Sequence, residues 1–398
     1  MMNWLLHLPV PVEFGAGCLD RLGRHLGGAR HALLVTGRHA MRAAGVTDQI
    51  SGILSAAGCA VQVYEAISSD PNYDEIEAAA DVARRVGASV IIGCGGGSAM
   101  DAAKAVAVVA THPGPIMDYV SGGPSQITAA TLPVVAISST SGTGSHVGRV
   151  AVLSDRSRSL KRALASDYLY PRVAFCDAQV LRTMPPDVTA VTGFDAFAQA
   201  LEGYLSRADN PMGKLCAQEA LRVIYRALPA AIADGDDLEL RNQMAWGDTL
   251  AGISLASNAI ITPHSFSMVL GGRYDITHGR AIASVTPACL ENSRPKAVDR
   301  LAQVARLLGC SEPLSDEELA DWAIASIERF IVDLGLGRSL SDYGVAESEF
   351  AAIALETRSA FGLRVDADPV PQDAAGLERI LRRSVERWQE LEASDGQA

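Results

Sequence analysis

The chain has 398 residues, of which 48% are apolar and only 5% aromatic, and its formal net charge is −12. This length favours two domains over one, and the composition suits an α/β or all-α protein. The acidic balance argues against nucleic acid and anionic membrane surfaces as partners, because both attract basic protein faces.

Short apolar runs alternate with helical patterns up to residue 184. The expected strands are residues 31–37, 60–67, 89–95, 132–138 and 172–177, and residues 73–87 are expected to form a helix. Apolar runs without polar alternation indicate strands that are buried on both faces, as in a largely parallel sheet covered by helices. We therefore expect an α/β domain over residues 1–184.

Helical patterns dominate after the proline pair at residues 185 and 186. They cover residues 213–232, 238–257, 315–335 and 377–393, and strand-like runs nearly vanish. Prolines are typical of a boundary between structural segments. We expect an all-helical domain over residues 185–398.

The cysteines and the N-terminal stretch indicate the cellular compartment of the protein. The seven cysteines are scattered without CxxC spacing, so neither a disulfide framework nor a zinc–thiolate site is expected. The N-terminal stretch lacks the basic segment and apolar core of a signal peptide, and no run of ~18 apolar residues is present to span a bilayer. These features predict a cytoplasmic protein.

The stretch "SVIIGCGGGSAMDAAK" (89–104) indicates a strand, a glycine turn and a helix. Gly95, Gly96 and Gly97 lack a Cβ, which allows a ligand to approach the backbone, and Ser98 is expected to cap the helix. The free amides and the dipole of a helix start attract phosphate. A plain strand–helix turn is the alternative, but the position after a buried strand favours the pyrophosphate of a dinucleotide.

Two further loops follow expected strands. The hydroxyl-rich loop "ISSTSGTGSHVGR" (137–149) is a candidate to line the same crevice, although such clusters are also typical of ordinary loops. Gly37 ends the first strand, where an acidic residue would hold the ribose 2′-hydroxyl and repel a 2′-phosphate. Because Arg38 and His39 follow instead, we expect NADP(H) to be favoured over NAD(H).

Two separate segments carry candidate metal ligands. Asp195 and Gln199 are four residues apart in a helical pattern and therefore share one helix face. His264 and His278 lie among glycines and small apolar residues. Imidazole nitrogen and carboxylate oxygen together suit Zn²⁺ or Fe²⁺, but spacing alone does not show that the two segments meet.

Four ordered motifs resemble the iron-containing (group III) metal-dependent alcohol dehydrogenase family. "GGGSAMDAAK" is similar to the family's GGGSxxDxAK, "SSTSGTGSHV" to TTxGTGSEV, "AVTGFDAFAQALEGYLS" to AxTGxDAxxHAxExYxS, and "HSFSMVLGGRYDITHG" to HxxAHxLGGxxxxPHG. The resemblance implies a Rossmann-like N-terminal domain and a helical C-terminal domain, the dehydroquinate synthase-like architecture, with the active site between them.

The resemblance also implies the activity and the site residues. It implies hydride transfer between the nicotinamide C4 of NAD(P)H and a small aldehyde or primary alcohol held on a divalent metal, with Fe²⁺ ahead of Zn²⁺, in a homodimer. The implied metal ligands are Asp195, Gln199, His264 and His278. The implied cofactor contacts are Gly37, Asn72, Gly95, Gly96, Gly97, Ser98, Asp101, Ser139, Thr140, Thr143 and Lys161.

Several positions depart from the family pattern. Gln199 and Met268 replace histidines, His146 replaces a glutamate, and Ser138 and Thr277 replace prolines. A glutamine carbonyl is a neutral and harder donor than imidazole, so we expect weaker metal binding and a shift away from soft metals. Met268 leaves the proton route open.

Three alternative functions remain at this point. The first is reduction of an anionic aldehyde such as phosphonoacetaldehyde, which applies if Arg149, Arg273, Arg280 or Lys161 faces the substrate, because guanidinium groups bind carboxylate and phosphonate in a bidentate manner. The second is a dehydroquinate synthase-like lyase, whose pattern GGGxxGDxxG and glutamate first ligand differ from this chain. The third is a metal-free, non-catalytic relative that binds a nucleotide.

Overall fold

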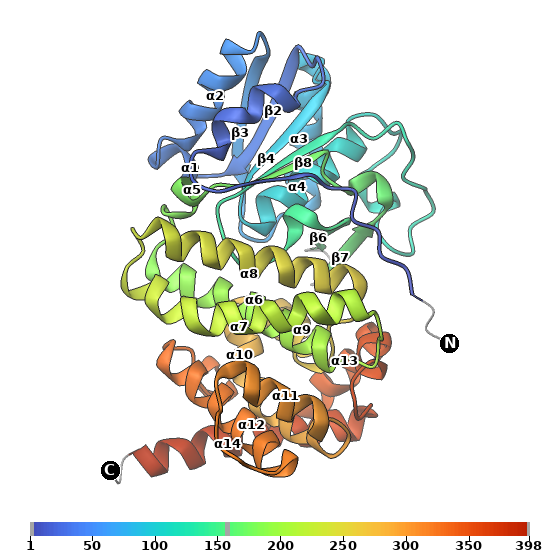
Figure 1. Ribbon diagram of the computed structural model, residues 1–398. Coiled ribbons are helices and arrows are strands. Elements are labelled where there is room, and N and C mark those ends of the chain that lie inside the picture. The colour runs from blue at the N-terminus through green and yellow to red at the C-terminus, as the bar shows by residue number, and fades with distance from the viewer. Residues whose placement is uncertain (1–3, 156–159, 396–398) are drawn as a thin grey trace. The chain divides into compact units, whose positions relative to one another are not determined.

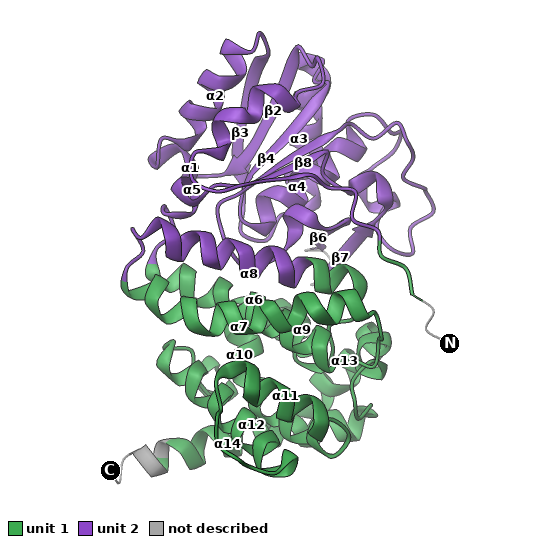
Figure 2. Cartoon of the chain, in the orientation of Figure 1, with its two compact units in different colours: residues 1–6, 186–233, 253–398 green, residues 7–185, 234–252 purple. Residues whose placement is uncertain are grey.

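The computed structural model describes residues 4–155 and 160–395. The chain divides into two compact units, shown in Figure 2. The sheet unit comprises His7–Pro185 and Asp234–Gly252, and the helical unit comprises Met1–Leu6, Pro186–Ala233 and Ile253–Ala398. The division into domains 1–184 and 185–398 stays a prediction. Residues 234–252, which that division puts in the helical domain, cluster here with the sheet unit.

A six-stranded parallel sheet forms the centre of the sheet unit, with the strand order β1-β8-β5-β4-β2-β3 (Figure 1). Its strands are β1 (Val12–Phe14), β2 (His31–Gly37), β3 (Ala60–Ile67), β4 (Val90–Gly95), β5 (Val134–Ser138) and β8 (Val173–Cys176). The five expected strands are present, and the prediction of a parallel sheet is confirmed. The short edge strand β1 was not predicted.

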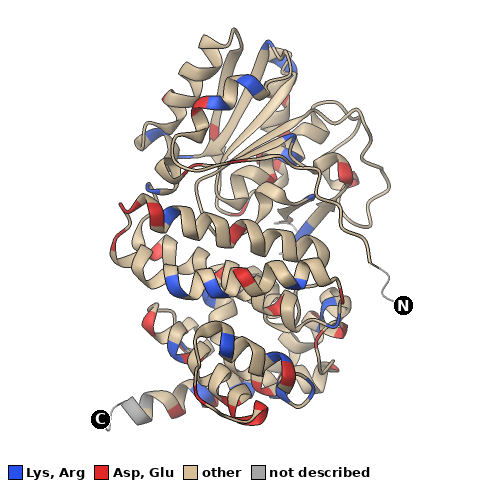
Figure 3. Cartoon of the chain, viewed as in Figure 1, with Lys and Arg blue, Asp and Glu red and all other residues tan. Residues whose placement is uncertain are grey.

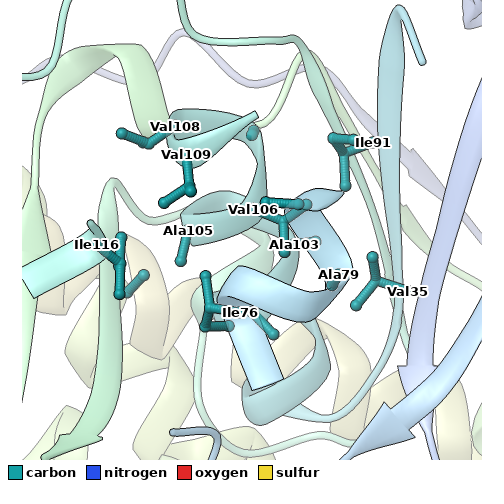
Figure 4. Packing of buried hydrophobic residues seen from close by; sticks show 14 of the residues in the cluster. Val35, Ile76, Ala79, Ile91, Ala103, Ala105, Val106, Val108, Val109 and Ile116 are labelled. Atoms are coloured by element: carbon teal, nitrogen blue, oxygen red, sulfur yellow. The ribbon is translucent and has the colours of Figure 1, made fainter. Parts of the chain in front are cut away.

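The central strands of this sheet are buried on both faces, and successive side chains of a strand point to opposite faces. Val35 and Ile91 pack against α3 (Tyr73–Val86) and α4 (Gly97–Val109), as Figure 4 shows. Leu34 and Ile92 belong to the other cluster, which includes residues of the 3-10 helix η1 (Cys18–His25) and of α2 (Val46–Ala56). This double burial explains why the strands show continuous apolar runs.

An antiparallel hairpin of β6 (Val150–Asp155) and β7 (Leu160–Ala165) forms a second, two-stranded sheet that the sequence did not predict. Residues 156–159, between its strands, lie outside the described residues. The remaining short elements of the sheet unit are α1 (Ala40–Ala43), η2 (Ile116–Asp118), η3 (Ser145–Val147), η4 (Asp167–Leu169) and α5 (Ala178–Leu181).

The described residues of the helical unit contain no strand. Its α-helices are α6 (Pro186–Leu205), α7 (Pro211–Ala233), α9 (Thr262–Tyr274), α10 (His278–Ser293), α11 (Val298–Leu308), α12 (Asp316–Asp333), α13 (Phe350–Asp366) and α14 (Ala374–Asp395). The 3-10 helices are η5 (Arg294–Lys296), η6 (Leu340–Tyr343) and η7 (Glu347–Glu349), and α8 (Leu238–Ser257) has residues in both units.

A cluster of buried side chains from α9, α10, α13 and α14 holds the helical unit together. Phe266, Val285, Phe350 and Leu381 are its representative members. This cluster packs α9, which carries His264 near its start, against α10, which begins at His278. Among the described residues, no helix has the length and apolar content needed to cross a bilayer.

Candidate functional site

Helix α6 presents three polar side chains on one buried face. Asp195, Gln199 and Glu202 follow each other at intervals of four and three residues, which places them one above the other on a helix. All three are buried, and the Gln199 side-chain amide donates a hydrogen bond to Asp195 Oδ1 at 3.3 Å. The expectation that Asp195 and Gln199 share one helix face is confirmed.

The turn between α9 and α10 brings His278 back to His264. Asp275 ends α9 in the left-handed conformation with φ 56°, and α10 begins at His278. Gly279 then packs directly on α6, because a Cβ at this position would lie 2.3 Å from the carbonyl oxygen of Val191. A glycine is therefore required where α10 starts against the helix that carries Asp195.

These elements bring the donor atoms of Asp195, His264 and His278 together. One ligand atom from each lies within 4.8 Å of the others, with His264 Nε2 3.2 Å and His278 Nε2 3.8 Å from Asp195 Oδ1. Gln199 Oε1 is buried and has no hydrogen-bond partner. A carboxylate, two imidazoles and the neighbouring Gln199 amide, whose oxygen is unsatisfied, form a donor set that suits a divalent cation.

Sequence reasoning missed the side chain that orients His264. The His264 Nδ1–H donates to Glu202 Oε1 at 2.5 Å, and the other Glu202 oxygen accepts from the backbone N–H of Ile261 at 2.6 Å. This bond directs Nε2 toward Asp195 Oδ1, 3.2 Å away, which is how carboxylates orient ligating histidines. The sequence did contain a signal for Glu202: it follows Asp195 by seven residues, which places both side chains on the same face of a helix.

Electrostatics around His264 reflect the two carboxylates. Burial lowers its pKa, but Glu202 and Asp195 outweigh this effect and raise the pKa to about 9. A ligating imidazole is neutral, so a cation that binds here displaces that proton. His278 retains about a third of its side-chain exposure, and its Nδ1 lies 3.1 Å from Ser267 Oγ.

The glycine turn of the sheet unit forms as expected, with one correction. Gly95 has φ 150°, Gly96 is the N-cap of α4, and α4 begins at Gly97. The prediction that Ser98 caps this helix is wrong: Ser98 is the second helical residue, and its hydroxyl donates to the carbonyl of Ser69. No side chain caps α4, so its first amides remain available to a ligand.

The hydroxyl-rich loop after β5 lies against this glycine turn. A Cβ at Gly96 would be 3.2 Å from Thr140, and one at Gly97 would be 2.7 Å from Thr143. The side-chain hydroxyls of Thr140 and Ser141 are buried without hydrogen-bond partners. The structure thus brings the two predicted loops together at the carboxyl ends of β4 and β5, where open α/β sheets bind ligands.

Buried charges hold this loop in place. The Lys104 ammonium, which is fully buried, donates to the carbonyl and hydroxyl of Ser145 and to the carbonyl of Val150. Asp101 accepts from the Ser145 hydroxyl and the Val152 N–H. Burial lowers the pKa of Lys104 to about 8, against the opposing effect of Asp101. Asp101 therefore already has protein partners for both oxygens.

The histidine that departs from the family pattern is also buried in the sheet unit. His146 Nε2 lies 2.9 Å from Thr249 Oγ1, and Asp248 accepts the Gly144 N–H at 2.9 Å. Burial lowers the pKa of His146 to about 4, with a further contribution from Lys104, so the ring is neutral at physiological pH. An uncharged side chain thus stands at position 146, where the family pattern has a glutamate.

Other predicted cofactor residues occupy positions around the same sheet edge. Asn72 is the N-cap of α3, where its Oδ1 accepts from the Glu75 N–H in a capping box. Lys161 forms an ion pair with Asp70 at 2.5 Å. Gly37 ends β2, and Ile67 O, 3.8 Å away, is the nearest atom that a Cβ would meet, so the position has room for a side chain.

The four cations considered for an anionic substrate all have carboxylate partners. Arg149 pairs with Asp167, Arg273 with Glu356, Arg280 with Asp187 and Lys161 with Asp70. None of the four is therefore an unpaired cation in the structure.

Two family models match the chain. Residues 9–178 match the model for iron-containing alcohol dehydrogenase, and residues 189–384 match the C-terminal model of the Fe-containing alcohol dehydrogenase family. The chain belongs to the iron-containing alcohol dehydrogenase family. This iron-containing alcohol dehydrogenase is an oxidoreductase that acts on CH–OH groups, and its family implies a divalent metal, usually iron, and NAD(H).

Known relatives of this family member span nearly its whole length. It is 34% identical to long-chain-alcohol dehydrogenase 1 of Geobacillus thermodenitrificans, over 93% of the chain and 90% of the relative. It is 31% identical to the NAD-dependent methanol dehydrogenase of Bacillus methanolicus, over 87% of the chain and 91% of the relative. The structure of sulfoacetaldehyde reductase from Bifidobacterium kashiwanohense in complex with NAD⁺ matches with a TM-score of 0.88 and 26% identity, over 97% of this chain and 99% of that one. The predicted α/β and helical architecture is confirmed.

Proposed function

We propose that this dehydrogenase interconverts small aldehydes and primary alcohols at a divalent metal held by Asp195, Gln199, His264 and His278. One observation carries the proposal: the ligand atoms of Asp195, His264 and His278 converge within 4.8 Å, and the amide of Gln199, whose oxygen is unsatisfied, contacts Asp195. When bound, the metal supplies Lewis-acid chemistry to a carbonyl or hydroxyl oxygen. NADPH or NADP⁺ supplies or accepts the hydride at its nicotinamide ring.

The side chains of the helical unit would fix the geometry of this centre. Glu202 keeps the proton of His264 on Nδ1, so that Nε2 presents a lone pair to the cation. Gln199 keeps its amide nitrogen on Asp195, and its buried oxygen, which has no hydrogen-bond partner, is available to the cation. His278 is the partly exposed member, which makes its side the natural entrance for the substrate. Four buried or half-buried donors of this kind are expected to need little reorganisation on binding.

The residues of the sheet unit would hold the dinucleotide. We assign the pyrophosphate to the start of α4 and the remaining contacts to the two neighbouring loops. The proposed contacts are Gly37, Asn72, Gly95, Gly96, Gly97, Ser98, Asp101, Ser139, Thr140, Thr143 and Lys161. Thr140 supports this assignment because its buried hydroxyl has no protein partner.

We propose NADP(H) over NAD(H) as the cofactor. Gly37 places no carboxylate at the end of β2, and the next residue is Arg38. The Arg38 guanidinium is more than half exposed and pairs with Glu75 at 3.2 Å, which leaves donors free for a 2′-phosphate. An exposed ion pair of this length is weak, so a doubly charged phosphate can compete for the guanidinium.

We propose Fe²⁺ ahead of Zn²⁺, with Gln199 as an oxygen ligand. Changing Gln199→His replaces the oxygen donor by an imidazole nitrogen, which softer metals prefer. Zn²⁺ affinity is expected to rise by at least about tenfold, since even groups that only support ligands change affinity that much. Competition with a chromophoric chelator measures this affinity, and Gln199→Ala is the control that removes the donor altogether. Equal Zn²⁺ affinity in all three proteins would exclude Gln199 as a ligand.

An NADPH-oxidation screen tests the proposed activity. Protein purified without chelator is mixed with NADPH and neutral or anionic aldehydes, with Fe²⁺, Zn²⁺, Mn²⁺ or Ni²⁺ added in parallel. Absorbance at 340 nm is expected to fall with aldehyde and metal together and to stay constant when either is omitted. A constant absorbance in every mixture would instead favour the lyase, which returns its cofactor unchanged, or the metal-free relative.

Reduction of an anionic aldehyde such as phosphonoacetaldehyde is the second candidate. One structural relative is a sulfoacetaldehyde reductase, so the same fold accommodates a substrate with a permanently charged group.

We also propose a homodimer. The edge strand β1 leaves one side unpaired within the sheet, and Phe14 on this strand is exposed beside the exposed ring of Trp246. An unpaired strand edge flanked by aromatic surface is typical of a surface that a second chain covers.

A further inference from the structure

Arg364 is an unusual cation among the described residues. Figure 3 shows positively and negatively charged residues interspersed over the helices, and most buried or half-buried arginines have a carboxylate or carbonyl partner. Within residues 4–155 and 160–395, Arg364 is the only lysine or arginine that is not exposed and whose charged group makes neither an ion pair nor a hydrogen bond. Withdrawing a charge from water without a partner is costly, so such a group calls for an explanation.

The backbone that follows Arg364 adjoins α9 and the end of α6, two of the three helices that carry the metal-site residues. Asp368, just beyond the end of α13, accepts a hydrogen bond from Thr262 Oγ1 at 2.6 Å, and Thr262 lies two residues before His264 on α9. The carbonyl of Ala367 accepts from the N–H of Arg207 at 2.8 Å, just beyond the end of α6. The segment 364–368 is thus attached to the start of α9, two residues before His264, and to the chain just after α6.

The guanidinium lies within electrostatic reach of the same site. Burial lowers the pKa of Arg364, and the Glu202 carboxylate opposes this shift. Glu202 does not pair with Arg364, because its oxygens are used by His264 and Ile261. Arg364 therefore adds, within electrostatic reach of the carboxylate that supports His264, a positive charge that no carboxylate of the described chain contacts.

The conformation of α13 holds this guanidinium in place. The helix is interrupted at Phe361, whose φ of −126° and ψ of 25° are not helical. The Phe361 ring lies under the guanidinium, with 5.3 Å between the guanidinium carbon and the ring centroid. Stacking on an aromatic face orients the planar group and leaves its N–H donors directed sideways, where a fork of donors matches the oxygens of one anion.

We propose that Arg364 binds the anionic group of the substrate and makes this enzyme selective for aldehydes that carry a carboxylate, phosphonate or sulfonate. This inference rests on the proposed function, in which the aldehyde carbon accepts a hydride from NADPH and its oxygen a proton, giving the primary alcohol and NADP⁺. Arg364 takes no part in that transfer: it positions the charged end of the substrate. The other candidate cations, Arg273 and Arg280, are already neutralised by Glu356 and Asp187.

Paired substrates test the proposal. Wild-type enzyme and Arg364→Gln are compared on two anionic aldehydes, 4-oxobutanoate and phosphonoacetaldehyde, and on two neutral ones, methyl 4-oxobutanoate and butanal. Loss of a charge-assisted hydrogen bond is expected to lower kcat/KM for an anionic aldehyde by about 10- to 150-fold, mainly through KM. The neutral aldehydes are expected to change by less than about twofold. Comparing carboxylate with phosphonate identifies which anion fits.

Two further variants separate recognition from folding. Arg364→Lys keeps the charge and is expected to recover part of the selectivity, whereas Arg358→Gln removes a cation of the same helix that pairs with Asp366 and is expected to leave the ratio of anionic to neutral rates unchanged. Equal losses on anionic and neutral aldehydes in Arg364→Gln, or no loss on either anion, would overturn the proposal.

A binding measurement keeps the test independent of turnover. Titration calorimetry with succinate and with phosphonoacetate, in the presence of NADPH, compares wild-type protein with Arg364→Gln. Tighter binding of at least one anion by the wild type supports the anion site even if no aldehyde is reduced. The absence of aldehyde reduction would then contradict only the proposed function. Equal binding by both proteins counts against Arg364 whatever the aldehyde screen shows.

Discussion

Replacing His264 by alanine is expected to lower aldehyde reduction at least about 10³-fold, because the metal then loses a ligand and with it the stabilisation of charge that develops on the substrate oxygen. NADPH binding is expected to persist, since the proposed cofactor contacts all belong to the sheet unit. Turnover is measured at saturating metal, metal content by elemental analysis, and NADPH affinity by fluorescence titration.

The loss of His264 also removes one of the two hydrogen-bond partners of Glu202, and a buried carboxylate oxygen without a partner destabilises a fold by itself. The variant His264→Asn addresses this, because its side-chain amide can donate to Glu202 while offering no imidazole nitrogen. The exposed His31 at the start of β2 provides the control His31→Ala, which should retain activity and metal. Turnover near the wild-type level in His264→Asn, in a protein of unchanged melting temperature, would contradict the metal mechanism.

The sheet of this protein could be predicted from local sequence because its strands are buried on both faces. Residues 31–37 form β2 as expected, and residues 89–95 differ from β4 by one position. The hairpin β6–β7 was missed because β6 alternates between buried and less buried positions, a pattern that six residues define only weakly. β1 has three residues, too few for any periodicity.

The metal site could be predicted only in parts from the residues themselves. The face shared by Asp195 and Gln199 follows from helix geometry, but their meeting with His278 depends on the packing of Gly279 against Val191. A contact between residues so far apart in the chain leaves no trace in spacing, so the resemblance to a family was needed to join the segments. Glu202 could have been predicted, because its position on α6 places it on the same helix face as Asp195 and Gln199.

Arg364 had no such signal in the sequence. What sets it apart is the absence of a partner, and this depends on where every carboxylate of the surrounding helices lies. Arg273 and Arg280 were the more prominent candidates in the sequence because they flank His278, yet both are paired with carboxylates in the structure. Local sequence identifies cations, whereas tertiary structure determines which of them remain free to bind a ligand.

The change Gly37→Asp is expected to reverse the cofactor preference. A carboxylate at the end of β2 repels the 2′-phosphate of NADPH and accepts hydrogen bonds from the ribose hydroxyls of NADH. The ratio of kcat/KM for NADPH over NADH is expected to fall by about 10³-fold, from repulsion of several kcal/mol together with a charged hydrogen bond of about 1.5–3 kcal/mol. Both cofactors are assayed with one aldehyde and one metal.

Gly37→Ala is the matched control, because the nearest atom to an added Cβ is 3.8 Å away and the alanine adds volume without charge. It is expected to keep the preference for NADPH within about threefold, as surface changes without a named mechanism have small effects. A second variant, Arg38→Gln, should weaken NADPH binding alone, since the guanidinium would contact only the 2′-phosphate. If Gly37→Asp and Gly37→Ala show the same cofactor ratio as the wild type, the ribose is recognised elsewhere, and the argument from the end of β2 fails.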